Sequence, residues 1–248
     1  MDKKTALVTL MDNDFVIGFV GFIKSFLHFN PWFVYDIVVF DAGISRENKA
    51  YMKTFYPKII FERIDKKAYS DIRMEKTDPK LRKTYYTLEV FRLIQYERIV
   101  FMDMDIIVQG DIRELFNCRD GFAACRAYNA KLDALIDPIN SGVFVVNQKY
   151  LDVGVYRDLI RIARRGFSMP DQRTLNIYFR NKISYLPKKY NVEKRMLYTE
   201  KHAKILDEAV CIHYVASKPW QKIKPNDEEK RFKQLEDIWW RWYEYERS

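Results

Sequence analysis

Two aspartates, Asp103 and Asp105, directly follow the apolar segment Ile-Val-Phe-Met at residues 99–102. Residues two apart in an extended backbone face the same side, so both carboxylates can face one cation. Carboxylate oxygens are the ligands that Mg²⁺ and Mn²⁺ prefer, and either ion can bridge the oxygens of a diphosphate. Desolvating two carboxylates beside an apolar strand is costly unless a cation compensates them. The pattern therefore favours a metal site over a pair of helix caps or salt-bridge partners.

Other polar residues stand beside apolar segments elsewhere in the chain. His213 ends an apolar segment, and Lys218 follows it in a Lys-Pro-Trp turn whose ammonium group suits a phosphate. Asn140-Ser141-Gly142 precedes another apolar segment, and Gly142 would allow a backbone to approach a ligand closely. Each of these features has a common alternative interpretation, either a hydrogen-bonded core histidine or a simple turn.

Alternating strand-like and helix-like segments are predicted to position these residues, which favours a parallel sheet with helical crossovers. The expected strands are Lys4–Leu10, Tyr35–Phe40, Lys58–Phe61, Arg98–Met102, Gly142–Val146 and Val210–His213. The expected helices are Asp14–Phe29, a helix starting at Ser45, Thr84–Tyr96, Tyr150–Arg164, Asp171–Arg180 and Asp227–Glu246. Residues 68–83 are charged and aperiodic, so we expect a long loop there.

The composition fits a single α/β domain spanning residues 1–248. Charged residues make up 31% of the chain and argue against a membrane-embedded class. The first ten residues enter a strand-like pattern without the apolar region of a secretory signal, so we expect a cytoplasmic protein. Three cysteines, none in a C-x-x-C pair, argue against a disulfide framework.

The net charge of +9 is concentrated between Arg157 and Lys204, where thirteen Lys/Arg face four Asp/Glu. A local basic surface indicates an anionic partner, here an anionic glycan or glycolipid acceptor or a peripheral contact with an anionic membrane, although charge can also only aid solubility. Arg161, Arg164 and Arg165 would form one stripe on a predicted helix. The Trp-rich segment 238–243 could anchor at a membrane or pack against the domain. No recognition motif accompanies the charge, so nucleic acid is not an expected partner.

Four motifs occur in an order that resembles glycosyltransferase family 8, the retaining glycogenin-like and bacterial lipooligosaccharide galactosyltransferase-like group with the GT-A fold. They are Phe101-Met-Asp-Met-Asp-Ile-Ile-Val, Asn140-Ser-Gly-Val-Phe-Val-Val, Asp171-Gln-Arg-Thr-Leu-Asn, and His213 followed by Lys218-Pro-Trp. The resemblance covers Thr5 to about Trp220. It implies a Rossmann-like, mostly parallel sheet flanked by helices. Residues 1–110 would form the nucleotide-binding half, 111–220 the acceptor-side half and 221–248 a C-terminal aromatic helix.

The family resemblance also implies an activity and a set of site residues. The activity is transfer of a hexose, glucose or galactose, from a UDP-sugar to a glycan or glycolipid with retention of configuration and with Mn²⁺, or Mg²⁺, as cofactor. The implied metal ligands are Asp103, Asp105 and His213, and the implied catalytic residues near the transferred sugar are Asn140, Asp171 and Gln172. The implied donor contacts are Thr9, Leu10, Asp12, Asn13, Asp14, Lys83, Met104, Ser141, Gly142 and Lys218.

Two positions depart from the family pattern. The family usually has Lys or Arg sixteen residues before the first metal-binding aspartate, where this chain has Thr87, and Lys83 one helical turn earlier is the candidate replacement. Met169-Pro170 replaces the glycine common before Asp171. Two alternatives remain at this point: a catalytically inactive sugar-nucleotide-binding protein, and a phosphatase with an Asp nucleophile.

Overall fold

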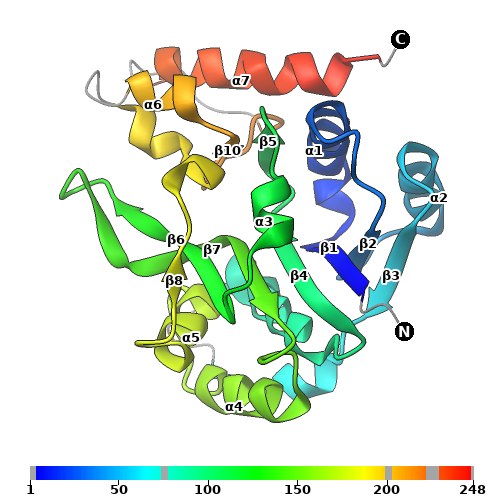
Figure 1. Cartoon of the computed structure of the whole chain (residues 1–248), viewed down its shortest axis with the longest axis vertical. Coiled ribbons are helices and arrows are strands. Elements are labelled where there is room, and N and C mark those ends of the chain that lie inside the picture. The colour runs from blue at the N-terminus through cyan, green and yellow to red at the C-terminus, as the bar shows by residue number, and fades with distance from the viewer. Residues whose placement is uncertain (1–3, 74–77, 199–202, 222–228, 247–248) are drawn as a thin grey trace.

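The computed structural model describes residues 4–73, 78–198, 203–221 and 229–246 (Figure 1). Its main sheet has the strand order β3-β2-β1-β4-β7-β6-β8. The strands are β1 (Lys4–Met11), β2 (Asp36–Asp41), β3 (Ile59–Arg63), β4 (Tyr96–Met102), β6 (Phe122–Asn129), β7 (Ala134–Asn147) and β8 (Ser184–Tyr185). The first four in sheet order run parallel, whereas β7 is antiparallel to both of its neighbours and β8 is parallel to β6. The predicted mostly parallel α/β sheet is confirmed.

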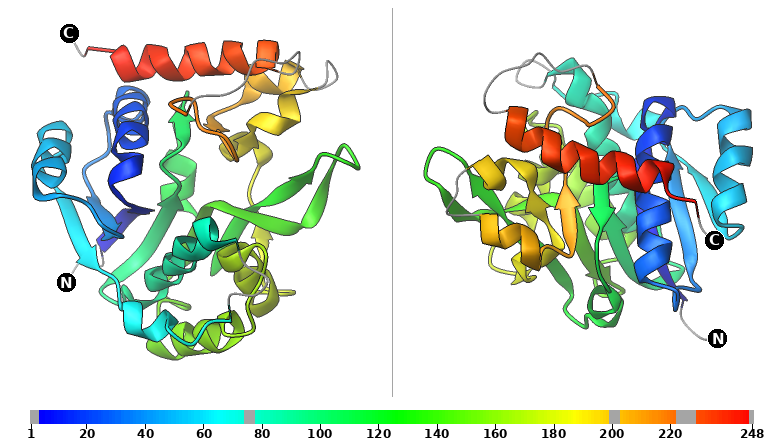
Figure 2. Two further views of the ribbon diagram at one scale, coloured as in Figure 1. Left: turned by 180° about the vertical axis from the view of Figure 1, so that it is seen from behind. Right: turned by 90° about the horizontal axis from the view of Figure 1, so that it is seen from above.

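Different helices cover the two faces of this sheet (Figures 1 and 2). One face packs against α1 (Val16–Phe29), α2 (Arg46–Phe55) and α3 (Arg113–Asn117), and the other against η3 (Pro79–Arg92), α4 (Val153–Ala163) and α5 (Pro170–Tyr178). Strand side chains alternate between the two layers: Leu7 packs with the first group, and Ala6 and Val8 pack with the second. Because side chains on both faces of the sheet pack against helices, the strands are apolar almost throughout.

A second, three-stranded sheet consists of β5 (Ile106–Val108), β10 (Cys211–His213) and β9 (Val192–Glu193), with β10 in the middle. The helices α6 (Ala203–Glu208) and α7 (Glu229–Glu244) lie at this end of the molecule, and α7 also runs beside α1 (Figure 1). Trp239 of α7 is fully buried, with its ring centroid 5.1 Å from that of Trp220. The aromatic C-terminal segment therefore packs against the domain, one of the two roles that its sequence allowed.

The predicted boundaries differ from the observed ones in two places. Helical turns with the tighter 3-10 geometry begin at Pro79 in η3, and another such turn, η2, covers Lys66–Tyr69, so the expectation of one continuous loop over 68–83 is wrong. The strand expected at residues 142–146 begins at Ala134, because it forms a long antiparallel hairpin with β6. The remaining short 3-10 turns are η1 (Asn13–Phe15), η4 (Lys188–Tyr190) and η5 (Lys194–Tyr198). Residues 227 and 228 of the expected last helix lie outside the described residues.

The described residues contain no helix with the length and apolar character needed to cross a membrane.

Candidate active site

One pocket of 340 Å³ lies at the carboxyl ends of β1 and β4. From β1 the chain adds β2 and then β3 toward one edge of the sheet, and it then returns to place β4 on the other flank of β1. The strand order therefore reverses between β1 and β4. Open α/β sheets bind their ligands in the crevice at such a reversal. The side chains around this pocket, the active-site pocket, come from Leu10, Met11, Asp12, Phe15, Ala42, Leu81, Lys83, Thr84, Thr87, Asp103, Met104, Asp105, Ser141, Asp171, Ala216 and Lys218.

The three predicted metal ligands converge beside this pocket. Nε2 of His213 lies 3.6 Å from Oδ2 of Asp103 and 3.3 Å from Oδ1 of Asp105. The three residues offer ligand atoms within 4.8 Å of one another. They meet because His213 of β10 pairs with Ile106 of β5, the strand that starts directly after Asp105. Two carboxylates and one imidazole form a donor set that fits Mn²⁺ or Mg²⁺.

A buried asparagine orients the imidazole. Oδ1 of Asn191 lies 2.8 Å from Nδ1 of His213, and we assign the proton to Nδ1, which leaves the Nε2 lone pair facing the carboxylates. The Asn191 amide nitrogen donates to Oδ1 of Asn140 at 2.8 Å, and that oxygen also accepts from the Gly142 backbone N–H at 2.9 Å. Sequence reasoning missed Asn191 in this role, because no motif connects it with His213.

Gly142 makes room for this histidine. A Cβ atom at residue 142 would lie 2.2 Å from Cε1 of His213 and 2.7 Å from its Nδ1. The close approach predicted at Gly142 is thus made by a metal-ligand side chain, with the Gly142 carbonyl also accepting from the Asp103 backbone N–H at 2.9 Å.

The two carboxyl groups have opposite pKa shifts. Burial and the adjacent Asp105 carboxylate raise the pKa of Asp103 to about 8. Burial also acts to raise the pKa of Asp105, but Lys218 and His213 outweigh it and hold that pKa well below its usual range. Because Lys218 and His213 hold Asp105 in its charged form, a proton shared by the pair resides on Asp103.

We expect the affinity for Mg²⁺ to rise from pH 6 to about 8 and then level off, because a ligating carboxyl group must lose its proton. A raised carboxyl pKa means that the folded, metal-free protein binds a proton that the unfolded chain has lost, so its stability decreases from about pH 4 to about 8. Titration calorimetry in two buffers of different ionisation enthalpy would count the protons released. An affinity that is constant from pH 6 to 8 would contradict the shift.

Two lysines of the pocket wall pair with acidic residues of the same pocket. Lys218 donates to Oδ2 of Asp105 and, at 3.2 Å, to the Tyr214 carbonyl. Lys83 forms an ion pair with Asp12, so the predicted replacement for the family's basic residue does lie on the pocket wall, together with Thr87.

Some predicted site residues lie away from the pocket lining. Thr9 is fully buried, and the Asn13 side-chain oxygen accepts from the Ser45 backbone N–H at 2.8 Å, which ties the end of β1 to the start of α2. The predicted residues outside the lining are Thr9, Asn13, Asp14, Asn140, Gly142, Gln172 and His213, of which His213 lies directly behind Asp103 and Asp105. The lining residues that sequence reasoning missed are Met11, Phe15, Ala42, Leu81, Thr84 and Ala216. No periodicity or motif marks them.

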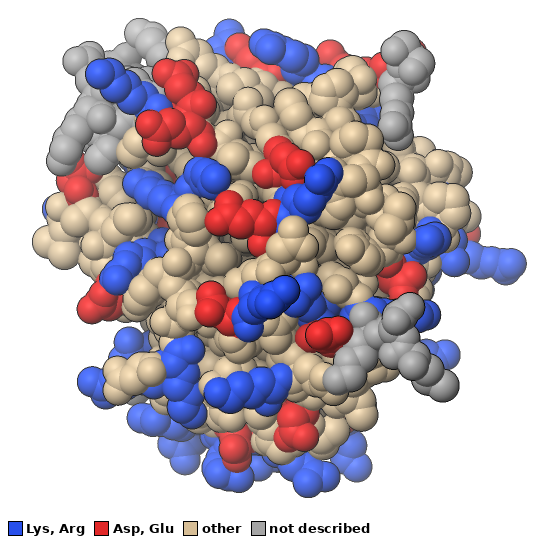
Figure 3. Space-filling model, in the orientation of Figure 1, with Lys and Arg blue, Asp and Glu red and all other residues tan. Residues whose placement is uncertain are grey.

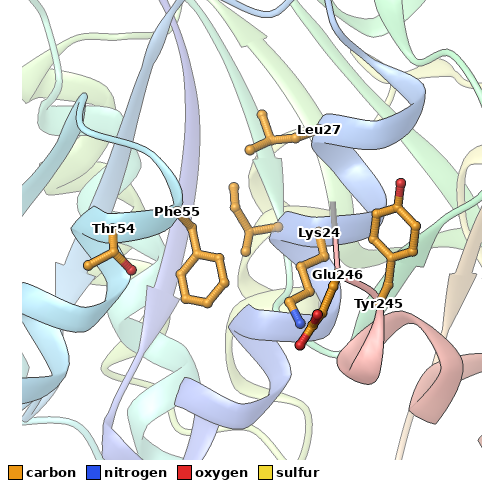
Figure 4. A pocket seen from close by; sticks show the side chains of 7 residues that line it. Lys24, Leu27, Thr54, Phe55, Tyr245 and Glu246 are labelled. Carbon is orange, nitrogen blue, oxygen red and sulfur yellow. The ribbon is translucent and has the colours of Figure 1, made fainter. Parts of the chain in front are cut away.

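A different pocket, between α1, α2 and the residues that follow α7, contains none of the predicted site residues (Figure 4). Its wall is largely apolar, with Leu27 and Phe55 facing the space, and Lys24 donates to the Tyr243 carbonyl.

A three-layer α/β domain with an acidic metal triad where its strand order reverses is the GT-A type of glycosyltransferase domain. Residues 6–224 match the family model of Glycosyl transferase family 8, and the chain belongs to this family. This is a family of glycosyltransferases, which removes the phosphatase alternative.

Relatives support this assignment at low identity. The chain is 25% identical to glycogenin of Neurospora crassa over 84% of its own length and 30% of that protein, and 25% identical to galactinol synthase 5 of Arabidopsis thaliana over 64% and 58%. It therefore spans less than two thirds of the length of these relatives. Two solved structures share the fold. The glycosyltransferase GlyE of Streptococcus pneumoniae has a TM-score of 0.73 at 19% identity, covering 99% of this chain and 61% of that one. The galactosyltransferase LgtC has a TM-score of 0.68 at 18% identity, covering 94% and 95%.

Proposed function

We propose that this protein transfers a hexose, glucose or galactose, from a UDP-sugar to a glycan or glycolipid acceptor with retention of anomeric configuration and with Mn²⁺ or Mg²⁺ as cofactor. The observation that carries the proposal is the convergence of Asp103, Asp105 and His213, two of which line the pocket at the carboxyl ends of β1 and β4 together with Lys218. When bound, the cation would offset the negative charge of the diphosphate leaving group. Relatives named for galactinol synthesis and galactosyl transfer support galactose as one donor sugar.

Each end of the pocket has side chains suited to one part of the donor. Lys218 would stabilise the charge that develops on the leaving diphosphate, since its ammonium group lies on the pocket wall next to the metal ligands. Leu10 and Asp12 at the end of β1 would hold the uracil ring, with the Asp12 carboxylate accepting from the base N3–H. Lys83 would keep that carboxylate in place through the observed ion pair.

Asp171 is the candidate for contact with the anomeric carbon. It lines the same pocket as Asp103, and burial raises its pKa while hydrogen bonds from Ser141 and Thr84 act in the opposite direction. A double displacement would use its carboxylate as the nucleophile. A same-face substitution would instead let the leaving phosphate take the proton of the acceptor hydroxyl, with Asp171 only orienting the sugar. Gln172 and Asn140, which lie outside the lining, would then act through Asp171 and the Asn191 contact, respectively.

The stereochemical outcome tests this proposal. Incubation with UDP-glucose or UDP-galactose and Mn²⁺ is expected to release UDP and to yield a sugar product that keeps the donor's α configuration, measured by proton NMR early in the reaction. A β product would contradict retention. Tight Mn²⁺-dependent binding of UDP without turnover of any UDP-sugar in a panel would favour the inactive sugar-nucleotide-binding alternative.

The location of the protein stays a prediction. Lys and Arg side chains gather at the end of the molecule where Figure 1 places α4 and α5 (Figure 3). We propose that this basic end faces an anionic partner. A cytoplasmic location and peripheral contact with an anionic membrane are compatible with it and remain untested predictions.

A further inference from the structure

A second pocket, of 840 Å³, lies beside helix α5, which also supplies Asp171 to the active-site pocket. Its wall includes Arg173 and Asn176 of α5, Arg180 two residues beyond the end of that helix, Asp137 and Pro138 of β7, and Tyr185 of β8. Asp171 and Arg173 are two residues apart on one helix, so α5 contributes side chains to both pockets. The second pocket is called the α5 pocket below.

The α5 pocket carries positive charge that no nearby carboxylate neutralises. Within the described part of the chain, neither Arg173 nor Arg180 forms a salt bridge, and Asp137 pairs with Arg126. Two other arginines of the basic segment differ in this respect: Arg161 pairs with Asp158 at 3.0 Å, and Arg164 lies 3.7 Å from Asp71. Uncompensated charge in a concave surface attracts anions more strongly than paired charge on an open one.

The first of the two arginines, Arg173, lies on helix α5, which is hydrogen-bonded to the sheet, and Arg180 lies two residues beyond the end of this helix at Tyr178. Between them, Oδ1 of Asn176 accepts from the Ile139 backbone N–H at 2.8 Å, and the Asn176 amide donates to the Ile139 carbonyl at 3.2 Å. Ile139 directly precedes Asn140 and Ser141, so this contact fixes α5, and with it Arg173, relative to the active site.

We propose that the α5 pocket binds an anionic group, a phosphate or a carboxylate, carried by the acceptor glycan at a distance from its reacting hydroxyl. The guanidinium groups of Arg173 and Arg180 present donors in a fork that fits either group in a bidentate manner. This inference rests on the proposed function, because it assigns the substrate class of the same enzyme.

The test compares charged and neutral disaccharides of the same size. Binding of trehalose 6-phosphate against trehalose, and of lactobionate against lactose, is measured by calorimetry with the donor pocket saturated by UDP and Mn²⁺. The first pair reports a phosphate and the second a carboxylate. The wild-type protein is expected to bind at least one charged sugar more tightly than its neutral partner, with an affinity that decreases as salt increases.

Two double variants separate the α5 pocket from the rest of the basic surface. Arg173→Gln/Arg180→Gln is expected to weaken binding of the charged sugar by about 10-fold or more, because two charge-assisted contacts are lost. Arg157→Gln/Arg161→Gln removes the same charge from α4 and is expected to stay within about 2-fold of wild type, since exposed charges outside the pocket contribute little. Melting temperatures verify that both variants fold.

Equal affinity for charged and neutral sugars, or equal weakening in the two double variants, would overturn the α5 pocket as an anion site. Turnover of a UDP-sugar by the wild-type protein reports separately on the proposed function. Turnover without charge-dependent binding overturns the anion site alone, whereas charge-dependent binding without turnover of any UDP-sugar overturns the proposed activity alone.

Discussion

Asp103→Asn and His213→Ala are expected to abolish transfer and to weaken Mn²⁺-dependent binding of UDP by at least about 100-fold, while the fold stays intact. Each change removes one ligand atom from the only Asp/His group of this kind in the described part of the chain. Asn keeps the shape of Asp103, whose side chain is partly exposed, so core packing is undisturbed. Calorimetric titration of UDP with and without Mn²⁺, together with UDP release from a UDP-sugar, measures both effects.

The matched control is Asp158→Asn on α4. It also removes one carboxylate charge, but Asp158 is half exposed and pairs only with Arg161. We expect its UDP affinity and turnover to equal those of the wild-type protein. Full activity of Asp103→Asn in the presence of EDTA would show that the triad holds no catalytic metal.

Gly142→Ala is expected to reduce metal affinity as strongly as His213→Ala, although residue 142 offers no ligand. The added Cβ would lie 2.2 Å from Cε1 of His213, so the imidazole must leave its place and its hydrogen bond with Asn191. Displacing a buried side chain should also lower the free energy of unfolding by roughly 1–3 kcal/mol. Thermal melting and Mn²⁺ titration measure the two effects.

Two further variants isolate the cause. Gly110→Ala is the matched control, because its Cβ would meet the Val210 methyl groups at 3.4 Å, an ordinary contact, and both effects should be absent. In Gly142→Ala/His213→Ala the conflict with the imidazole is gone and only the 3.0 Å approach to Oδ1 of Asn140 remains, so stability should be closer to that of His213→Ala alone than the sum of the two changes predicts. A Gly142→Ala protein that binds Mn²⁺ like the wild type would contradict the assigned role.

The pair of aspartates in the candidate metal site could be predicted from local sequence because its signals are local, whereas His213 was assigned to that site through the family resemblance. Asp103 and Asp105 follow a buried strand at a spacing of two, and the extended backbone alone brings such carboxylates to the same side. The same holds for the alternation of strands and helices that predicted the parallel sheet. The predicted boundaries were wrong at residues 79–83 and 134–141, where the sequence pattern was weak. Residues 79–83 form the first turns of η3, and residues 134–141 are strand because they pair with β6.

The partners of these residues depend on contacts between distant segments. Asn191 reaches His213 and Asn140 only because β9 pairs with β10 beside the end of β7, and Gly142 is needed only because His213 arrives there. Likewise, the sequence indicated one basic segment, but the fold brings Asp71 to Arg164, whereas no salt bridge within the described residues involves Arg173 or Arg180. Residue types and short spacings specify which chemistry is available, because they act within one element. Strand pairing and helix packing specify which groups meet, because these join residues that no local spacing relates.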